Sequence, residues 1–307
     1  MSTTKRYSLE EIKRKVIDVL RDVDTGLSGI EIAEKTGINR ITITKYLSVL
    51  EAIGLIKRKK VGSVNVWHLQ QGVTELELPI DILDVQRLYM DAVFRGAEDE
   101  ARRLIINVIH SDVDPVRVLA EVIAPTINTA GELYSRGRMT VTEVMFITNL
   151  IDESLDLIKF NAEREEVKQD AYAVFMSAQG EMHTLGPKVA SVAFYLRCWA
   201  IYFLGNVASE VDLLFDIDLL KFLDKIWKTE RGVMVLGVSV TLKERLKSIA
   251  QTIKSVREKL RKNVHVLDGG EAFRTEDALT QSVEADFIAK DLYSAVEWAE
   301  KLYGKGR

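Results

Sequence analysis

The sequence contains a single cysteine, Cys198, and no run of about 18 apolar residues. One cysteine excludes an intrachain disulfide and any cysteine-rich zinc site, which fits a reducing compartment. A shorter apolar run cannot span a bilayer as a helix. The first residues, Met1 to Tyr7, also lack the apolar stretch of a signal peptide. We therefore expect a cytoplasmic protein that has no membrane partner.

The common catalytic signatures are missing as well. The sequence has no Gly-x-Ser-x-Gly elbow, no phosphate-binding glycine-rich loop and no His-Glu-x-x-His helix. We therefore expect a binding protein rather than an enzyme, and we assign no catalytic residue.

Charge is distributed unevenly along a chain whose length favours two or three domains. Residues 1–72 contain 13 Lys or Arg and 8 Asp or Glu, which gives this segment a charge of +5. Residues 73–307 contain 29 basic and 38 acidic residues, which gives −9 and accounts for the total of −4. A basic module joined to an acidic one indicates that only the basic module meets a polyanion.

Residues 8–70 have the pattern of three helices followed by a β-hairpin. A capping box begins the second helix at Ser28, and Asn39 is a suitable N-cap for the third. A Gly-Ser turn then separates the segment from Leu55 to Lys60 from the alternating segment from Val64 to Leu69. This order resembles the winged helix-turn-helix domain of bacterial and archaeal regulators. The resemblance predicts an α+β DNA-binding domain over residues 1–72.

The third helix and the hairpin carry the predicted contacts with double-stranded DNA. Phosphate contacts supply most of the affinity, whereas base edges in the major groove supply the specificity. For any single residue the alternative is an ordinary solvated surface, and this alternative is preferred for Ser48 and Asn65. The predicted DNA-binding residues are Asn39, Arg40, Thr42, Thr44 and Lys45 on the helix, and Lys57, Arg58, Lys59 and Lys60 on the hairpin.

Residues 80–167 have an entirely helical periodicity, with apolar side chains at every third or fourth position. Pro115 suits the first turn of one of these helices. The pattern predicts a four-helix bundle. A short connector over residues 73–83 precedes it, and its brevity and apolar content favour mechanical communication over a flexible tether.

Residues 168–307 change to short apolar runs that alternate with helical segments. The runs begin at Ala171, Ala200, Gly232 and Asn263. Strands that alternate with helices indicate a doubly wound parallel sheet of the Rossmann-like α/β class. Ligand sites in such sheets lie at the carboxyl ends of the strands. The predicted protein is therefore multidomain: a winged helix, a four-helix bundle and an α/β domain.

The loop after the first of these strands contains Glu181 and His183. An imidazole at the carboxyl edge of a parallel sheet is placed to meet a ligand. A carboxylate two residues earlier can hydrogen-bond the other ring nitrogen, which fixes the tautomer and raises the basicity of a metal-bound histidine. A lone histidine is more often a surface or packed residue, but His183 is accompanied by further motifs.

Three motifs follow three predicted strands: Glu181-x-His183-x-x-Gly186, Ser239-Val240-Thr241-Leu242 and Gly269-Gly270. The set resembles the cobalamin (vitamin B12)-binding module of B12-dependent methyltransferases, mutases and B12-responsive repressors. The resemblance implies that His183 is the lower ligand of the cobalt, that Glu181 orients it, and that cobalamin is bound base-off. It also implies that the displaced nucleotide tail enters the sheet edge beside Ser239 and the paired glycines. Thr241 stands where the family has leucine.

The helical segment before the α/β domain fits the same resemblance, since in that family a bundle covers the upper face of the corrin. Its Gly-Glu-x-aromatic segment, residues 131–134, places Tyr134 at the position of the capping aromatic. The resemblance therefore implies a cap over residues 80–167 and a cobalamin-binding domain over residues 168–307.

Two functions are compatible with this organisation. One is a cobalamin-responsive transcriptional regulator, a homo-oligomer such as a dimer, whose operator affinity changes when corrinoid binds between cap and α/β domain. The other is a corrinoid methyl-carrier component of a methyltransferase system. The winged helix favours the regulator, because a methyl carrier has no evident use for a DNA-binding domain.

Overall fold

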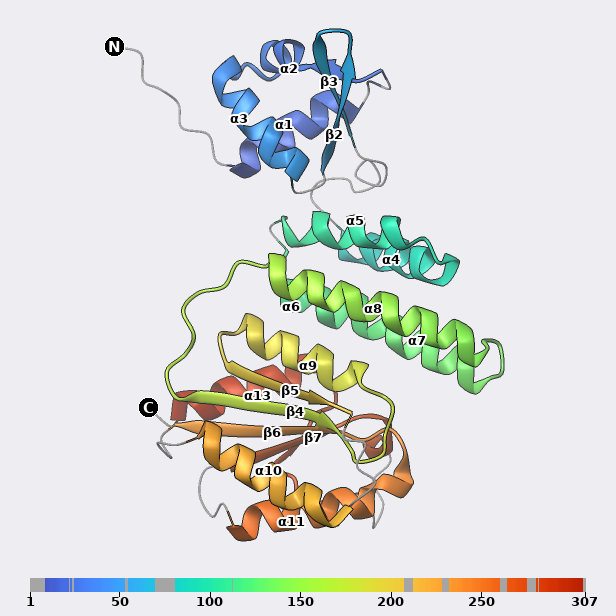
Figure 1. The fold of residues 1–307 in the computed structure, drawn as a ribbon, viewed down its shortest axis with the longest axis vertical. Helices are drawn as coiled ribbons and strands as arrows, with labels where there is room; N and C mark the ends of the chain where they lie inside the picture. The colour runs from blue at the N-terminus through green and yellow to red at the C-terminus, as the bar shows by residue number, and fades with distance from the viewer. Residues whose placement is uncertain are drawn as a thin grey trace. The chain divides into compact units, whose positions relative to one another are not determined.

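In the computed structural model the chain divides into two compact units, residues 1–114 and residues 115–307 (Figure 1). The connector expected at residues 73–83 falls mostly outside the described residues, and the expected domain boundaries stay predictions. Within the described residues, no helix is long and apolar enough to cross a bilayer. The structure describes residues 9–21, 23, 25–52, 55–69, 81–111, 113–206, 212–227, 232–259, 264–274, 280 and 282–305.

Unit 1 begins with a winged helix, as the sequence predicted. Its helices are α1 (Leu9–Arg21), α2 (Gly29–Thr36) and α3 (Arg40–Ala52). Its strands are β1 (Leu27–Ser28), β2 (Ile56–Val61) and β3 (Val64–Leu69), which form an antiparallel sheet in the order β1-β3-β2. The predicted capping box is present, because Ser28 and Glu31 exchange backbone-to-side-chain hydrogen bonds at the start of α2.

The core of the winged helix lies between the three helices and β3. Ile43, Leu47 and Leu50 follow each other at spacings of four and three on α3, and all three are buried. They pack in one cluster with Ile32 of α2 and Trp67 of β3. Because these spacings put the buried residues on one helix face, the opposite face of α3 is left in solvent.

The second part of unit 1 is a pair of helices, α4 (Ile82–Arg95) and α5 (Glu98–Ile109). Gly96 ends α4 with φ +69°, a left-handed conformation that glycine adopts without a Cβ penalty. The connection between the helices is two residues long, so α4 and α5 pack against each other as neighbours.

Unit 2 begins with helices and thereby completes the helical region that the sequence predicted. The first helix, α6 (Pro115–Val118), continues through one π-helical turn, η1 (Leu119–Ile123), into α7 (Ala124–Ser135), and α8 (Val141–Asn161) packs against α7. Pro115 occupies the first position of α6, as expected. The assembly of these helices with α4 and α5 into a four-helix bundle stays a prediction.

The rest of unit 2 is a doubly wound α/β domain, in agreement with the predicted class. Its five parallel strands are β4 (Ala171–Ser177), β5 (Ala200–Gly205), β6 (Val233–Ser239), β7 (Val264–Gly269) and β8 (Phe287–Ile288). The helices α9 (Leu185–Leu196) and α13 (Leu292–Lys305) pack together, as do α10 (Asp212–Ile226) and α11 (Leu246–Lys259), and the two pairs cover opposite faces of the sheet (Figure 1). Two short turns are η2 (Lys243–Arg245) and η3 (Glu271–Phe273).

The strand order β5-β4-β6-β7-β8 places the topological switch point between β4 and β6. The chain leaves β4 for β5 on one side and later returns to form β6 on the other side. Ligands of doubly wound sheets bind outside the carboxyl ends of the strands at such a point. The three predicted cobalamin motifs follow β4, β6 and β7, so the fold brings them to one edge.

Candidate functional site

Three of the predicted cofactor residues meet at the carboxyl edge of the sheet. His183 Nδ1 lies 3.0 Å from Oε1 of Glu181, in the loop between β4 and α9. The backbone N–H of Thr241, in the loop after β6, lies 2.9 and 3.0 Å from the two carboxylate oxygens of Glu181 and donates to them. Glu181 is fully buried, whereas the His183 side chain is 55% exposed. A fixed carboxylate therefore stands behind an imidazole that faces solvent.

The electrostatics of this pair suit a metal-binding imidazole. Burial acts to raise the pKa of the Glu181 carboxyl, but the hydrogen bonds from His183 and Thr241 outweigh it, so the pKa lies below its ordinary value. The hydrogen bond to Glu181 raises the pKa of His183. Because the carboxylate accepts the hydrogen bond from Nδ1–H, Nε2 is the nitrogen left for a metal ion.

The backbone of the histidine loop is fixed by a residue that the sequence reasoning missed. Ser177, the last residue of β4, is buried, and its hydroxyl donates a 2.8 Å hydrogen bond to the carbonyl of His183. Ser177 also pairs in register with Ser239 of β6. A lone serine at the end of an otherwise apolar strand was the signal that could have revealed it.

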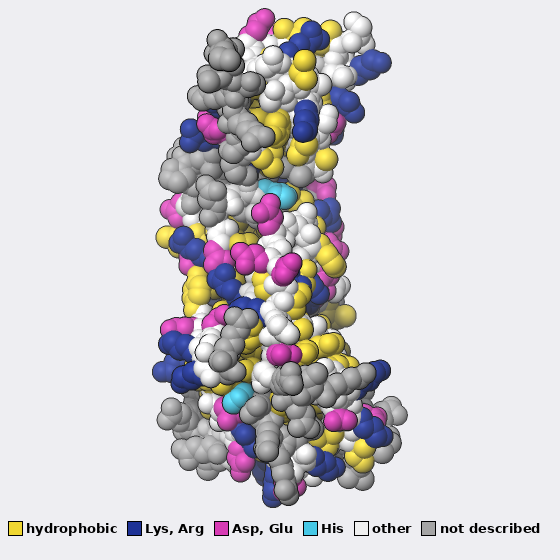
Figure 2. Space-filling view, turned by 90° about the vertical axis from the view of Figure 1, so that its left-hand side faces the viewer, with side chains coloured by type: hydrophobic (Ala, Val, Ile, Leu, Met, Phe, Trp, Pro, Cys, Tyr) yellow, Lys and Arg dark blue, Asp and Glu magenta, His cyan; other side chains and the backbone are white. Residues whose placement is uncertain are grey.

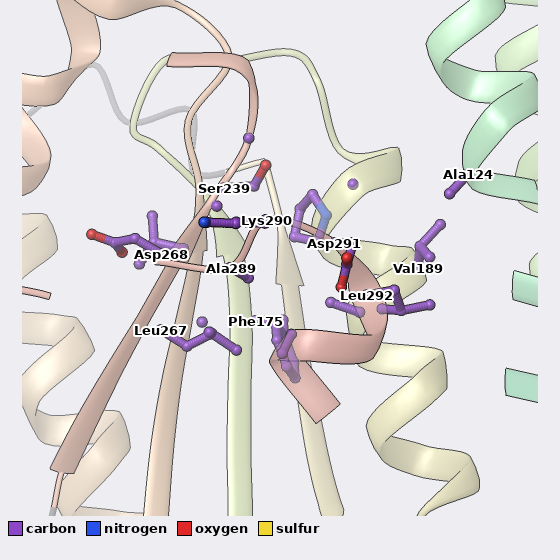
Figure 3. A pocket seen from close by; sticks show the side chains of 18 of the residues that line it. Ala124, Phe175, Val189, Ser239, Leu267, Asp268, Ala289, Lys290, Asp291 and Leu292 are labelled. Carbon is purple, nitrogen blue, oxygen red and sulfur yellow. The ribbon is translucent and has the colours of Figure 1, made fainter. Parts of the chain in front are cut away.

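A cavity of about 220 Å³ lies at the same edge of the sheet (Figure 3). Its walls come from β4, β6 and β7, from α9, from the start of α13 and from α7. Most of the wall is apolar, as shown by Phe175, Val189, Leu267 and Leu292. Of the predicted cofactor residues, the lining includes Gly186, Ser239, Gly269 and Gly270, but not Glu181, His183, Thr241 or Tyr134.

An exposed imidazole beside a separate apolar cavity fits a base-off corrinoid. Such a cofactor needs a protein nitrogen for its cobalt and a second space for its displaced tail. His183 would hold the cobalt and the cavity beside Ser239 would hold the tail, which is the division that the sequence predicted. When bound, a corrinoid supplies a cobalt centre whose upper axial ligand can be exchanged.

The paired glycines differ in what the fold requires of them. Gly270 has φ +107° and ψ 174°, and a Cβ there would lie 2.4 Å from the carbonyl oxygen of Val240. Gly269 has no positive φ, and among the described residues a Cβ there would meet only the carbonyl oxygen of Ala289, at 4.0 Å. Gly270 is therefore demanded by the backbone itself, whereas Gly269 leaves space toward the cavity.

We accordingly expect Gly270→Ala to destabilise the α/β domain by about 2–5 kcal/mol, since it combines a glycine-only conformation with a steric clash. Gly269→Ala is the matched control, with an expected loss below about 1 kcal/mol. Urea unfolding followed by circular dichroism measures both losses. Equal free energies of unfolding for the two variants would contradict a conformational and steric requirement for glycine at position 270.

Tyr134 lies in the last turn of α7, and its side chain is 46% exposed. In Figure 1 the connection between α7 and α8 lies on the side of unit 2 toward which β4 and β5 point. The same side carries the histidine loop. The role of Tyr134 as the aromatic residue that covers the corrin stays a prediction.

The predicted DNA contacts on α3 are mostly exposed, but two of them also have local roles. The Asn39 side chain accepts the backbone N–H of Ile41 at 2.8 Å, which caps the helix as expected. The Thr44 hydroxyl donates to the carbonyl of Arg40 at 2.8 Å. Arg40, Thr44 and Lys45 are exposed, whereas Thr42 is half-buried. Figure 2 shows basic side chains on the winged helix, at the top of the view.

The four basic residues of the hairpin, Lys57 to Lys60, are all exposed on β2. Arg58 stands opposite Trp67 in the sheet, and its guanidinium lies 5.7 Å from the centre of the indole ring. The same group is 3.3 Å from the Glu51 carboxylate. Arg58 is therefore engaged within the domain, which leaves the three lysines as the stronger candidates for phosphate contact.

Two family models match the chain in the regions just described. A winged helix-turn-helix DNA-binding model matches residues 9–57, and a B12 binding domain model matches residues 85–159. The chain joins a winged helix-turn-helix DNA-binding domain to a B12 binding domain. The second match runs from α4 into α8, which is the helical region that the sequence predicted as the cap.

Relatives of the B12-binding part are corrinoid proteins. Dimethylamine corrinoid protein 3 of Methanosarcina acetivorans is 21% identical over 198 residues, which cover 64% of this chain and 87% of that protein. Dimethylamine corrinoid protein 1 of the same organism is 22% identical over 193 residues, or 62% and 84% of the two chains. The cofactor of this domain is a corrinoid.

A solved structure confirms the fold. The monomethylamine corrinoid protein of Methanosarcina barkeri superposes with a TM-score of 0.59 at 15% sequence identity. The alignment covers 72% of this chain and 99% of that protein. The likeness extends to the fold alone.

Proposed function

We propose that this chain is a corrinoid-responsive transcriptional regulator of the cytoplasm, with no catalytic activity of its own. The corrinoid is bound base-off, with His183 as the lower cobalt ligand and Glu181 as the carboxylate that orients it. Binding of the corrinoid, or exchange of its upper ligand, changes the affinity of the winged helix for an operator. The functional form is a homo-oligomer such as a dimer.

One observation carries this proposal: an oriented, solvent-facing imidazole and an exposed basic recognition helix occur in the same chain. The Glu181 carboxylate is fully buried and held by Thr241, which favours a role for His183 that depends on ring orientation. Arg40 and Lys45 are exposed on α3. A regulator needs both parts, because a ligand can alter DNA binding only through a site on the same molecule or assembly.

The names of the relatives favour one alternative, a corrinoid methyl carrier. A carrier presents its cofactor to a separate methyltransferase and requires no contact with DNA. The two functions therefore differ in a measurable way. Only the regulator binds a particular DNA sequence with an affinity that depends on the corrinoid.

The test is the coupling between cobalamin and DNA in the full-length protein. A binding site is selected from a library of random DNA duplexes, and its affinity for apoprotein and for hydroxocobalamin-loaded protein is measured by fluorescence anisotropy at one fixed salt concentration. We expect the two dissociation constants to differ by about fivefold or more, which is the lower end of allosteric coupling. By linkage, the selected duplex must change the affinity for hydroxocobalamin by the same factor.

A random duplex of equal length is the control, because non-specific phosphate binding is expected to show little coupling. Equal dissociation constants for the selected duplex with and without cobalamin would contradict the regulator. Failure of the full-length protein to bind any duplex at low salt would instead favour the methyl carrier.

A further inference from the structure

Ile41, in the first turn of α3, has an unusual environment for a large apolar side chain. It is 81% exposed, although it belongs to a helix whose other large aliphatic residues are largely buried. Single exposed apolar residues are common on protein surfaces and need no explanation by themselves. The exposure of Ile41 is informative because of where this residue lies on α3.

The helical register separates Ile41 from the core. Ile43 belongs to the buried face of α3, and a residue two positions away lies about 200° around the helix. Ile41 instead shares a stripe with Thr44, Lys45 and Ser48, which follow it by three, four and seven positions and are all exposed. An isoleucine therefore stands within the polar and basic face of the helix.

The backbone at this position is held by the cap of the helix. The Asn39 side chain accepts the N–H of Ile41 at 2.8 Å, and the Asn39 carbonyl accepts the N–H of Ile43 at 2.9 Å. A β-branched side chain in a helix has one strongly preferred χ1 rotamer. The methyl groups of Ile41 are thus presented in a nearly fixed direction at the N-terminal end of α3.

We propose that Ile41 is a specificity-determining residue that packs against the C5 methyl group of a thymine in the major groove. The inference rests on the proposed DNA binding. Residues at the N-terminal end of a recognition helix contact base edges, and thymine is the base that presents a methyl group there. Arg40 and Lys45, which flank Ile41, supply the charge that attracts the phosphates around such a contact.

A second copy of this chain is the other conceivable occupant of the Ile41 surface. The basic neighbours argue against it, because two copies of this face would bring like charges together around one small apolar contact. DNA complements both kinds of side chain on this surface: its phosphates complement Arg40 and Lys45, and the thymine methyl group complements Ile41.

The experiment removes the methyl group from the DNA and the side chain from the protein. In the selected duplex each thymine is replaced singly by uracil, which lacks only the methyl group, and binding of the full-length wild type and Ile41→Ala is measured. We expect uracil at one or two positions to weaken wild-type binding about three- to tenfold. The same replacement is expected to leave Ile41→Ala unaffected, so that the double-mutant cycle localises the contact.

Leu83→Ala is the matched control, because Leu83 is 64% exposed on α4, outside the winged helix. It is expected to keep the uracil sensitivity of the wild type. Wild-type protein that binds the duplex equally with thymine or uracil at every position would overturn the inference while leaving the proposed function intact. A change of sedimentation coefficient in Ile41→Ala, without uracil insensitivity, would assign the residue to a contact between copies. Absence of any specific DNA binding by the wild type would overturn both proposals.

Discussion

His183→Ala is expected to lower the affinity of the protein for hydroxocobalamin by more than about 100-fold. Loss of the carboxylate partner of a metal-bound histidine alone costs about 10–100-fold, so loss of the ligand itself should cost more. Glu181→Gln is accordingly expected to fall within the 10–100-fold range. In that variant the negative charge is lost, and only one acceptor oxygen remains for His183 and for the N–H of Thr241, because the amide NH2 that replaces the other oxygen cannot accept a hydrogen bond.

The measurement is a titration of the full-length apoprotein with hydroxocobalamin, followed by the absorption spectrum. The spectrum of the wild type is expected to report imidazole as the lower ligand, and that of His183→Ala is expected to lack this signature even at saturation. Met182→Ala is the control, since Met182 lies in the same loop with its side chain 80% exposed. An unchanged spectrum and affinity in His183→Ala would show that cobalt is ligated elsewhere.

The second large effect is a loss of stability of the α/β domain between about pH 4 and pH 8, caused by Asp268. This residue ends the apolar part of β7 and is fully buried, and within the described structure neither carboxylate oxygen has a hydrogen-bond partner. Figure 3 shows its carboxylate directed away from the cavity. Burial raises its pKa to about 8, with Arg257 opposing and Asp286 adding to the shift.

The sign follows from proton binding. Between the unfolded pKa, near 3.8, and the folded pKa, about 8, the folded chain binds one proton that the unfolded chain does not. The free energy of unfolding therefore falls as the pH rises through this range, by about 1.4 kcal/mol per unit and on the order of 5 kcal/mol in total. Asp268→Asn is expected to remove this slope, so that it matches the wild type near pH 4 and exceeds its stability by several kcal/mol above pH 8.

Urea unfolding at a series of pH values, followed by tryptophan fluorescence, measures the slope, because Trp199, Trp227 and Trp298 all belong to the α/β domain. Asp218→Asn is the control: its carboxylate is 74% exposed beside Lys221, and the expected change is within about 0.5 kcal/mol. If the free energy of unfolding depended on pH in the same way for the wild type and for Asp268→Asn, a raised pKa at Asp268 would be contradicted.

Much of the architecture follows from local pattern. The pattern of three helices followed by a hairpin and the capping box at Ser28 predicted the winged helix, and both features are present. Apolar runs alternating with helical segments predicted the doubly wound domain, which also matches. The π-helical turn at residues 119–123 and the two-residue strand β8 were not predicted, since neither is long enough to leave a periodic signal.

The sequence predicted which residues belong to the candidate site, but it did not predict what the fold requires of each of them. The Glu181-x-His183 spacing predicted the hydrogen bond between the two side chains because both residues lie in one short loop. The sequence treated Gly269 and Gly270 as equivalent, and only the conformation at Gly270 separates them. The sequence likewise placed Arg58 among the basic residues predicted to contact DNA. The register of β2 and β3 instead sets its guanidinium over the ring of Trp67.

By itself, the sequence determined which elements form and which motifs they carry, because helix periodicity, caps and strand alternation depend on neighbours within a few residues. The tertiary structure decided which distant residues those motifs contact and which side chains become buried. The order of the strands brought Thr241 to a carboxylate 60 residues earlier in the chain, and packing buried Asp268, whose carboxylate oxygens have no hydrogen-bond partner among the described residues. These outcomes depend on strand pairing and packing between distant segments, for which no local pattern in the chain exists.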